Sequence, residues 1–202
     1  LQTFGLRVGA EQPRYVLLEH SGPFEIRRYA PSIVAQTTVS GEESEARSQG
    51  FRKLAGYIFG NNQSRSEIAM TSPVSQAHSQ EIAMTSPVAQ AASDKGWTVQ
   101  FFMPAKYTKA DLPTPNDPDV QLFELPSTTY AVLSFSGYAT PQLITRKKGE
   151  LMTEANAQGR VSSGEPMVWF YDPPWTIPFL RHNEVAIKLE TQRKPLSSSS
   201  PT

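Results

Sequence analysis

The sequence predicts an α+β fold: a distorted, mostly antiparallel β-barrel built from two pseudo-repeat halves and flanked by two α-helices. Two observations lead to this prediction. Each half of the chain contains short β-rich runs, then one amphipathic helical stretch, then further β-rich runs. Antiparallel strands in two matching halves can also close on themselves and leave no exposed sheet edge, with one helix of each half covering the outside.

Composition narrows the class of protein further. A length of 202 residues suits one domain or two small ones. The 19 basic residues balance the 19 acidic ones, so we expect neither nucleic acid nor an anionic membrane as the main partner, because both attract a basic surface. No apolar run is long enough to span a bilayer. The absence of cysteine excludes disulfides, thiolate ligands and cysteine nucleophiles.

The first half is expected to begin with a flexible arm, residues 1–13, which is polar and has little periodicity. Three strands are then predicted, at residues 14–19, 24–29 and 32–39, separated by clusters of turn residues.

A helix is expected over residues 40–59. Ser40 with Glu43 fits a capping box, and Gly60-Asn61 supplies a left-handed stop. Four apolar residues at helical spacing form one stripe that we expect to pack on the sheet: Phe51, Leu54, Ala55 and Ile58.

A duplicated segment follows this helix. E-I-A-M-T-S-P-V-S-Q at residues 67–76 recurs as E-I-A-M-T-S-P-V-A-Q at residues 81–90, with one substitution, at Ser75. Two copies are too few for a solenoid. Alternation instead predicts two adjacent antiparallel strands joined by a short polar loop, with Met70 and Met84 in the core.

The second half repeats the order of the first. A strand at residues 97–103 and a proline-rich connection at 104–118 lead into it. Thr140 and Pro141 are typical of the N-cap and first residue of a helix. Its buried face should comprise Leu143, Ile144, Leu151, Met152 and Ala155. Strands are expected on both sides of this helix, at residues 120–125, 129–138, 165–171 and 184–189. The whole forms a single domain over residues 14–190, with halves at about 14–104 and 119–190, and residues 191–202 form a disordered tail by composition.

Four phrases resemble the SOUL haem-binding protein family. They are the doubled I-A-M-T-S-P-V, E-I-R-R-Y at residues 25–29, F-F-M-P-A-K-Y-T to L-P-T-P-N-D-P at 101–118, and Y-D-P-P-W at 171–175. The chain is therefore identified as a bacterial-type member of this family over residues 15–190. The resemblance implies a distorted β-barrel with two flanking helices. It also implies that haem or a related tetrapyrrole binds in a shallow apolar groove along the first helix and a neighbouring loop.

The haem-binding residues implied by the groove come from two stretches. The proline-stiffened loop contributes His182, Tyr171, Trp175 and Phe179, and the helix contributes Phe51, Arg52, Leu54 and Ile58. His182 is our first candidate for the iron ligand, because imidazole commonly ligates haem iron. It also departs from the family, in which arginine is common at this position and no axial ligand is invariant. His78 and His20 are the alternatives.

Three functions stay open at this stage. The first is binding of haem or another tetrapyrrole for transport, buffering or delivery. The second is an enzyme that removes the metal from the ring (a haem dechelatase), with His182 and Glu184 as catalytic candidates because metal removal needs proton donors. The third is a generic hydrophobic small-molecule binder, since such barrels resemble the effector-sensing domains of some bacterial regulators. No Walker, Rossmann or G-x-S-x-G motif occurs.

No structural metal is expected, because the three histidines lack metal-ligand spacing. We expect an exported protein, periplasmic or secreted, with a cytoplasmic one as the alternative. The chain starts at Leu1, and bacterial proteins that it resembles often carry a secretory signal just before such a segment.

Overall fold

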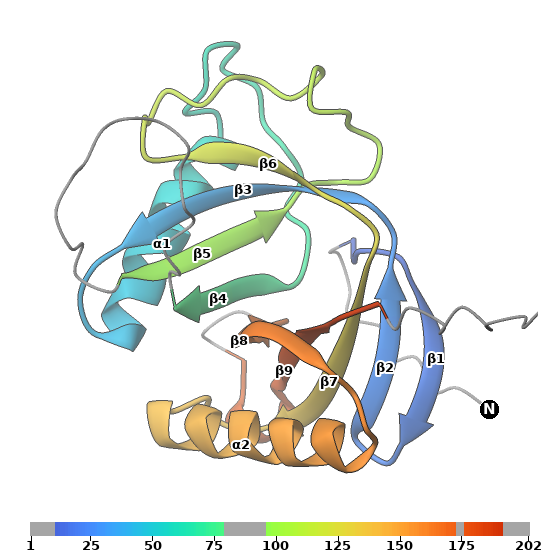
Figure 1. The fold of residues 1–202 in the computed structure, drawn as a ribbon. Coiled ribbons are helices and arrows are strands. Elements are labelled where there is room, and N and C mark those ends of the chain that lie inside the picture. The colour runs from blue at the N-terminus through green and yellow to red at the C-terminus, as the bar shows by residue number, and fades with distance from the viewer. Residues whose placement is uncertain (1–10, 79–95, 173–175, 192–202) are drawn as a thin grey trace, which may run out of the picture.

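A computed structural model of the chain describes residues 11–78, 96–172 and 176–191 (Figure 1). The strands are β1 (Tyr15–Ser21), β2 (Phe24–Tyr29), β3 (Ser32–Val39), β4 (Val74–His78), β5 (Trp97–Phe102), β6 (Gln121–Leu125), β7 (Thr128–Ser136), β8 (Ser162–Phe170) and β9 (His182–Leu189). The helices are α1 (Glu43–Ile58) and α2 (Pro141–Ala157), and a short 3-10 turn, η1 (Pro178–Leu180), precedes β9.

The strands form a single antiparallel sheet in the order β1-β2-β7-β9-β8-β4-β5-β3-β6. Within the described residues, β1 and β6 are the two ends of this sheet, so the curved sheet stays open. The α+β class and the distorted, mostly antiparallel barrel are therefore confirmed.

Each helix covers one half of the sheet (Figure 1). The α1 helix packs on β3 and β5, where Leu54 and Ile58 join Val99 and Phe101 in one buried cluster. The α2 helix packs on β7, β8 and β9. Its Ile144, Leu151 and Ala155 lie in a second cluster with residues of β2, β7 and β9, which confirms the predicted apolar face. None of the described helices is long and apolar enough to cross a membrane.

The helix caps were predicted correctly for α2 and wrongly for α1. Thr140 caps α2, because its hydroxyl oxygen accepts a hydrogen bond from the backbone N–H of Leu143 at 3.2 Å, and Pro141 follows as the first helical residue. The α1 helix begins two residues later than a Ser40 cap would require. Its N-cap is Glu42, whose carboxylate accepts hydrogen bonds from the backbone N–H groups of Ser44 and Glu45.

The hairpin predicted from the duplicated segment is also wrong. In the first copy only the residues from Val74 onward are in a strand, and β4 has β5 on one side and β8 on the other. Both edges of β4 are therefore occupied by β5 and β8. The second copy lies outside the described residues. Met70 was expected in the core but is 36% exposed, because the chain before Val74 does not follow the alternation of a strand. Met84 falls outside the described residues.

The predicted arm, residues 1–13, lies mostly outside the described part of the chain. Its Glu11 is already held by the fold: the Glu11 carbonyl accepts from the Ser72 N–H at 2.9 Å, and its carboxylate from the Ala105 N–H at 3.0 Å. The predicted tail beyond residue 191 is not described.

Candidate functional site

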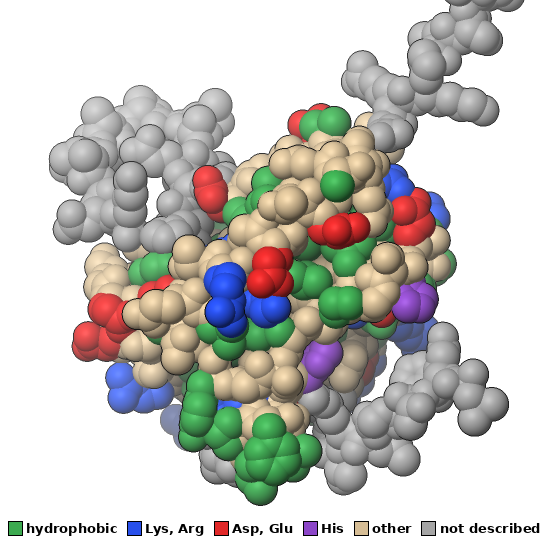
Figure 2. All heavy atoms as spheres, turned by 90° about the horizontal axis from the view of Figure 1, so that it is seen from below, with side chains coloured by type: hydrophobic (Ala, Val, Ile, Leu, Met, Phe, Trp, Pro, Cys, Tyr) green, Lys and Arg blue, Asp and Glu red, His purple; other side chains and the backbone are tan. Residues whose placement is uncertain are grey.

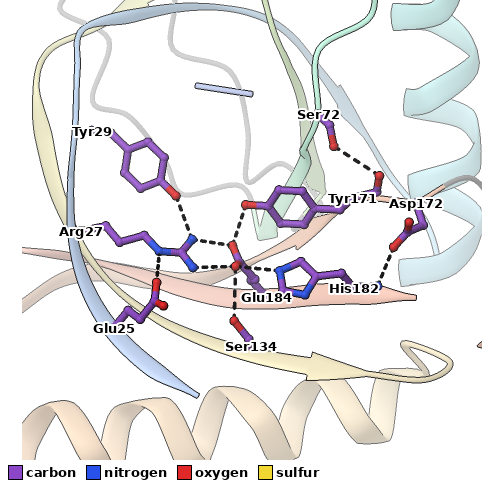
Figure 3. A network of polar contacts seen from close by, with 9 residues as sticks. All are labelled: Glu25, Arg27, Tyr29, Ser72, Ser134, Tyr171, Asp172, His182 and Glu184. Carbon is purple, nitrogen blue, oxygen red and sulfur yellow. Dashed lines mark hydrogen bonds and ion pairs between the residues drawn. The ribbon is translucent and has the colours of Figure 1, made fainter. Parts of the chain in front are cut away.

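A buried carboxylate, that of Glu184, stands at the centre of a polar network on the sheet (Figure 3). Glu184 lies near the start of β9 and is 1% exposed. The guanidinium of Arg27 donates to both carboxylate oxygens, from Nη1 to Oε2 at 2.9 Å and from Nη2 to Oε1 at 2.8 Å. The Tyr171 hydroxyl donates to Oε2 at 2.6 Å, and the Ser134 hydroxyl donates to Oε1 at 3.3 Å.

His182 completes the network from the same strand. Its Nε2 lies 2.9 Å from Glu184 Oε1. An ionised carboxylate only accepts hydrogen bonds, so Nε2 carries the hydrogen and a neutral imidazole keeps its lone pair on Nδ1. The side chain of His182 is 34% exposed and its ring lies against that of Tyr171, with ring centres 4.8 Å apart. His182 is thus the member of the network that connects the buried carboxylate to solvent.

Strand alternation explains why these side chains meet. On β9 the residues Val185, Ile187 and Leu189 face α2, so His182 and Glu184 point to the opposite face of the sheet. The same applies on β2, where Phe24 and Ile26 belong to the cluster under α2. The alternate residues of β2 lie on the side of the network: Glu25, Arg27 and Tyr29.

Arg27 is held by more than Glu184. Its Nε donates to the Glu25 carboxylate and its Nη1 donates to the Tyr29 hydroxyl oxygen at 3.1 Å. Its guanidinium also lies 4.6 Å from the centre of the Tyr15 ring, close enough for a cation–π contact. Arg27 is 5% exposed, so this pair of opposite charges is almost completely removed from water.

The charges of the network are strongly coupled. Burial raises the pKa of the Glu184 carboxyl, but hydrogen bonds from His182 and Arg27 and the charge of Arg27 outweigh burial and lower the pKa to about 2. Burial raises the pKa of the Tyr171 hydroxyl, and the negative charge of Glu184 raises it further. Glu184 is therefore a carboxylate and Tyr171 a neutral donor at every physiological pH.

Beside the network, aromatic rings fill the concave side of the sheet. Tyr29, Tyr130 and Trp169 contact one another with ring centres 5.3 to 5.7 Å apart, and Phe102 lies 6.5 Å from Trp169. The cleft among them has a volume of only about 10 Å³. That space holds about one water molecule. A porphyrin therefore does not fit into this cleft in the described arrangement.

The loop before His182 carries an exposed apolar surface. It comprises Ile177, Phe179 and Leu180, together with Tyr138 from the segment after β7, and we call it the η1 patch. All four side chains are more than half exposed, Phe179 to 73%. Figure 2, seen from the side of α2, shows hydrophobic side chains protruding at one edge of the molecule. Arg181 borders the patch, with its guanidinium 4.8 Å from the centre of the Tyr138 ring.

The backbone holds His182 at the edge of this patch. The Asp172 carboxylate accepts a hydrogen bond from the His182 N–H, and the His182 carbonyl accepts one from the Tyr171 N–H at 3.3 Å. Arg181 Nε donates to the Thr176 carbonyl at 2.8 Å. These contacts join the two ends of the loop and hold η1 directly before His182 in the chain.

The structure brings together only some of the predicted site residues. His182, Glu184 and Tyr171 are in direct contact, and Phe179 lies on the loop beside them. Trp175 is outside the described residues. Leu54 and Ile58 of α1 are fully buried, whereas Phe51 is partly exposed and packs on Phe101 with ring centres 5.3 Å apart.

The remaining candidates lie elsewhere in the fold. Arg52 is exposed on α1. His20 lines a surface hollow of about 380 Å³ with Glu19, Ser21, Phe24 and Gln158, and Phe24 is its one apolar side chain. His78 ends β4 opposite Trp97. No group of three or more His, Asp or Glu residues suited to a metal ion occurs in the described part of the chain.

Sequence reasoning missed Arg27 and Ser134 as partners of Glu184, and Tyr29 as a partner of Arg27. Part of the signal was present: Glu25, Arg27 and Tyr29 alternate along one strand, and three polar or aromatic residues on one face of a strand indicate a buried polar network when the other face is apolar. Their partner could not be predicted, because Arg27 and Glu184 are 157 residues apart.

Comparisons with known proteins agree with this fold. The model of the family described as SOUL heme-binding protein matches residues 10–188. Mouse heme-binding protein 2 is 30% identical over 171 residues, which cover 81% of this chain and 77% of that protein. Heme-binding protein 1 of Xenopus laevis is 30% identical over 163 residues, covering 80% of this chain and 81% of the relative.

Two solved structures share the fold at low sequence identity. The EcmrR C-terminal domain has a TM-score of 0.55 at 14% identity, covering 83% of this chain and 96% of that domain. An uncharacterized conserved protein from Listeria innocua has a TM-score of 0.50 at 13% identity, covering 91% and 94%.

Proposed function

The chain belongs to the SOUL heme-binding protein family, and we propose that it binds haem or a related tetrapyrrole on its surface, at the η1 patch beside His182, for transport, buffering or delivery. The observation that carries this proposal is the position of His182. It combines a partly exposed imidazole, a buried carboxylate behind it and an exposed apolar surface next to it.

The side chains around His182 match the chemical requirements of a porphyrin. A porphyrin needs an apolar surface for its face, an electron-pair donor for its iron and cations or water for its propionates. Phe179, Leu180 and Tyr138 supply the apolar surface. Arg181 supplies a guanidinium at its border. His182 supplies the donor.

The ring nitrogen that ligates iron follows from the hydrogen bond of the other nitrogen. Because Nε2 is engaged with Glu184, ligation is assigned to Nδ1 of His182. A carboxylate that holds the second ring nitrogen fixes the orientation of the imidazole and makes it a better donor. Glu184 is the positioning residue in this arrangement, and Arg27 keeps it ionised.

The same geometry weighs against the two alternatives. Metal removal needs proton donors, and Glu184, with a pKa of about 2 and only donors around it, has no proton to give. His182 alone of the two catalytic candidates can carry one. A generic binder of hydrophobic molecules needs an apolar cavity. The aromatic cleft has a volume of about 10 Å³, and the hollow of about 380 Å³ beside His20 has Phe24 as its one apolar side chain.

An absorbance titration with ferric haem tests the proposal. We expect a saturable, shifted Soret band for the parent protein and for His20→Ala, and loss of that shift in His182→Ala. Metal-free protoporphyrin should bind to His182→Ala as well as to the parent, because its contact with the η1 patch needs no ligand. Equal haem spectra for the parent and His182→Ala would overturn the assignment of His182. Slow appearance of the metal-free spectrum would support the enzyme, and no saturable change would refute tetrapyrrole binding altogether.

A further inference from the structure

We propose that the second copy of the duplicated segment replaces the first in the β4 position of the sheet. The protein would then exchange between two arrangements whose chain registers differ by 14 residues. The sequence of the second copy, the contacts of β4 and the length of the β4–β5 connection each support this exchange.

The two copies are nearly interchangeable in sequence. Residues 67–77 read E-I-A-M-T-S-P-V-S-Q-A, and residues 81–91 read E-I-A-M-T-S-P-V-A-Q-A, so Ser75 against Ala89 is the one difference in this stretch. The last residue of β4, His78, has Ala92 as its counterpart. A strand that pairs with two neighbours is normally specified by its own side chains. Here the chain contains those side chains twice.

The second copy satisfies the contacts that β4 makes. Val74 is buried between its cross-strand partners Phe101 and Phe170, and Val88 is the same residue in the second copy. The fully buried Gln76 donates from Nε2 to the Glu43 carbonyl at 2.9 Å, and Gln90 supplies the same amide.

Two further side-chain contacts of the first copy involve serine hydroxyls. The Ser72 hydroxyl donates to the Tyr171 carbonyl at 3.3 Å, next to the Glu184 network, and Ser86 supplies the same hydroxyl. The contact that would be lost is that of Ser75, whose hydroxyl lies 3.7 Å from the sulfur of Met167. Hydrogen bonds to thioether sulfur are weak, and alanine fits any space that serine fills. The β4 position therefore distinguishes poorly between the copies.

The connection between β4 and β5 favours the second copy. With the first copy in place, His78 pairs with Trp97 and the hairpin is closed by residues 79–96. Hairpin connections are usually two to five residues long. With the second copy in the same register, Ala92 opposes Trp97. The loop is then Ser93-Asp94-Lys95-Gly96, four residues of the types that form turns.

When the second copy occupies the β4 position, the connection that precedes the strand becomes 14 residues longer. It would lie between Ser66 and Glu81, after a turn in which Asn62 bonds to the Tyr57 and Ser66 carbonyls. That turn does not depend on which copy follows it. The free energy of closing a flexible loop changes only slowly with its length, so we expect populations of the two arrangements within about tenfold of each other.

Disulfide trapping distinguishes the arrangements, because the chain has no cysteine of its own. Ala77 lies opposite Thr98, and Ala91 is its counterpart in the second copy. Directly opposed residues have neighbouring Cβ atoms. Under mild oxidation we expect cross-links in both Ala77→Cys/Thr98→Cys and Ala91→Cys/Thr98→Cys. Gln90→Cys/Thr98→Cys is the matched control, because a shift of one residue turns the side chain to the other face.

Deletions give a second, independent measurement. Removing residues 67–80 leaves the second copy alone and a four-residue hairpin loop, and removing residues 81–94 leaves the first copy with a loop of equal length. Both shortened proteins should fold, with melting temperatures within a few degrees of each other. The proposal is overturned if the 67–80 deletion fails to fold while the 81–94 deletion folds. It is also overturned if Ala91→Cys/Thr98→Cys cross-links no faster than the Gln90→Cys control.

Discussion

Replacing Glu184 by glutamine should remove the charge that Arg27 is buried against, while keeping the shape of the side chain. Arg27 would then retain Glu25 as its carboxylate partner within the network. Breaking a buried ion pair by removing one partner costs about 3 to 5 kcal/mol, because the other charge remains buried without compensation. For a chain of this length, that corresponds to a fall of roughly 10 °C in melting temperature.

The same interaction predicts how stability depends on pH. The carboxyl of Glu184 has a pKa of about 2 in the folded protein, against an ordinary value of 4.5. A lowered pKa means that the folded state binds its proton less readily than the unfolded state. Its contribution to stability is therefore complete above pH 4.5 and is lost as the pH falls toward 2. At about 1.4 kcal/mol per pKa unit, this contribution is about 3 kcal/mol.

Urea denaturation at pH 7, 5, 4 and 3 measures both effects. The parent protein should lose stability over this range, and Glu184→Gln should start lower at pH 7 and lose about 2 kcal/mol less between pH 7 and pH 3, because the folded carboxyl, with its pKa of about 2, is still mostly ionised at pH 3. Lys53→Ala serves as the control for a surface ion pair. Its partner Asp119 lies 2.6 Å away but is well exposed, so the cost should stay below about 1 kcal/mol. If Glu184→Gln kept the pH dependence of the parent protein, the assignment of acid sensitivity to Glu184 would be refuted.

Three further predictions follow from packing, capping and exposure. Gly50→Ala should destabilise the protein by about 1 to 3 kcal/mol, because its Cβ would lie 2.6 Å from Val99 Cγ2. Gly56→Ala on the same helix meets nothing within 4 Å and should stabilise it by up to about 1 kcal/mol in the same urea assay. Thr140→Ala should cost about 1 kcal/mol through loss of the α2 cap, and an unchanged melting temperature would contradict that role. Phe179→Ser should leave stability within about 0.5 kcal/mol, since the side chain is 73% exposed, but should weaken haem binding several-fold by titration.

Local signals in the sequence were sufficient to predict most helices and strands and the N-cap of α2. Thr140-Pro141 stands alone as a start signal, and α2 begins there. Before α1, several residues that can cap a helix lie within a few positions of one another, and the carboxylate of Glu42 is the one that caps the helix rather than Ser40. Propensity does not separate such neighbouring candidates.

Pairing between strands that are distant in the chain could not be predicted from the sequence. The two copies of the duplicated segment have the same alternation, and nothing local indicates that the first copy lies between β5 and β8. The ion pair of Arg27 and Glu184 is a similar case. His182 and Glu184 could be identified as candidates because metal removal needs proton donors, but the cation opposite them comes from β2.

The network also suggests why binding and stability can be separated experimentally. Glu184 has hydrogen bonds from three elements besides its own strand, so removing His182 leaves Arg27, Tyr171 and Ser134 to hold the carboxylate. His182 is also the partly exposed member, so its loss uncovers little buried polar surface. Substitution at Glu184 or Arg27 instead leaves a buried charge without its partner, and any loss of binding there includes a loss of folded protein. Variants at His182 and on the η1 patch are therefore the ones that report on the ligand rather than on the fold.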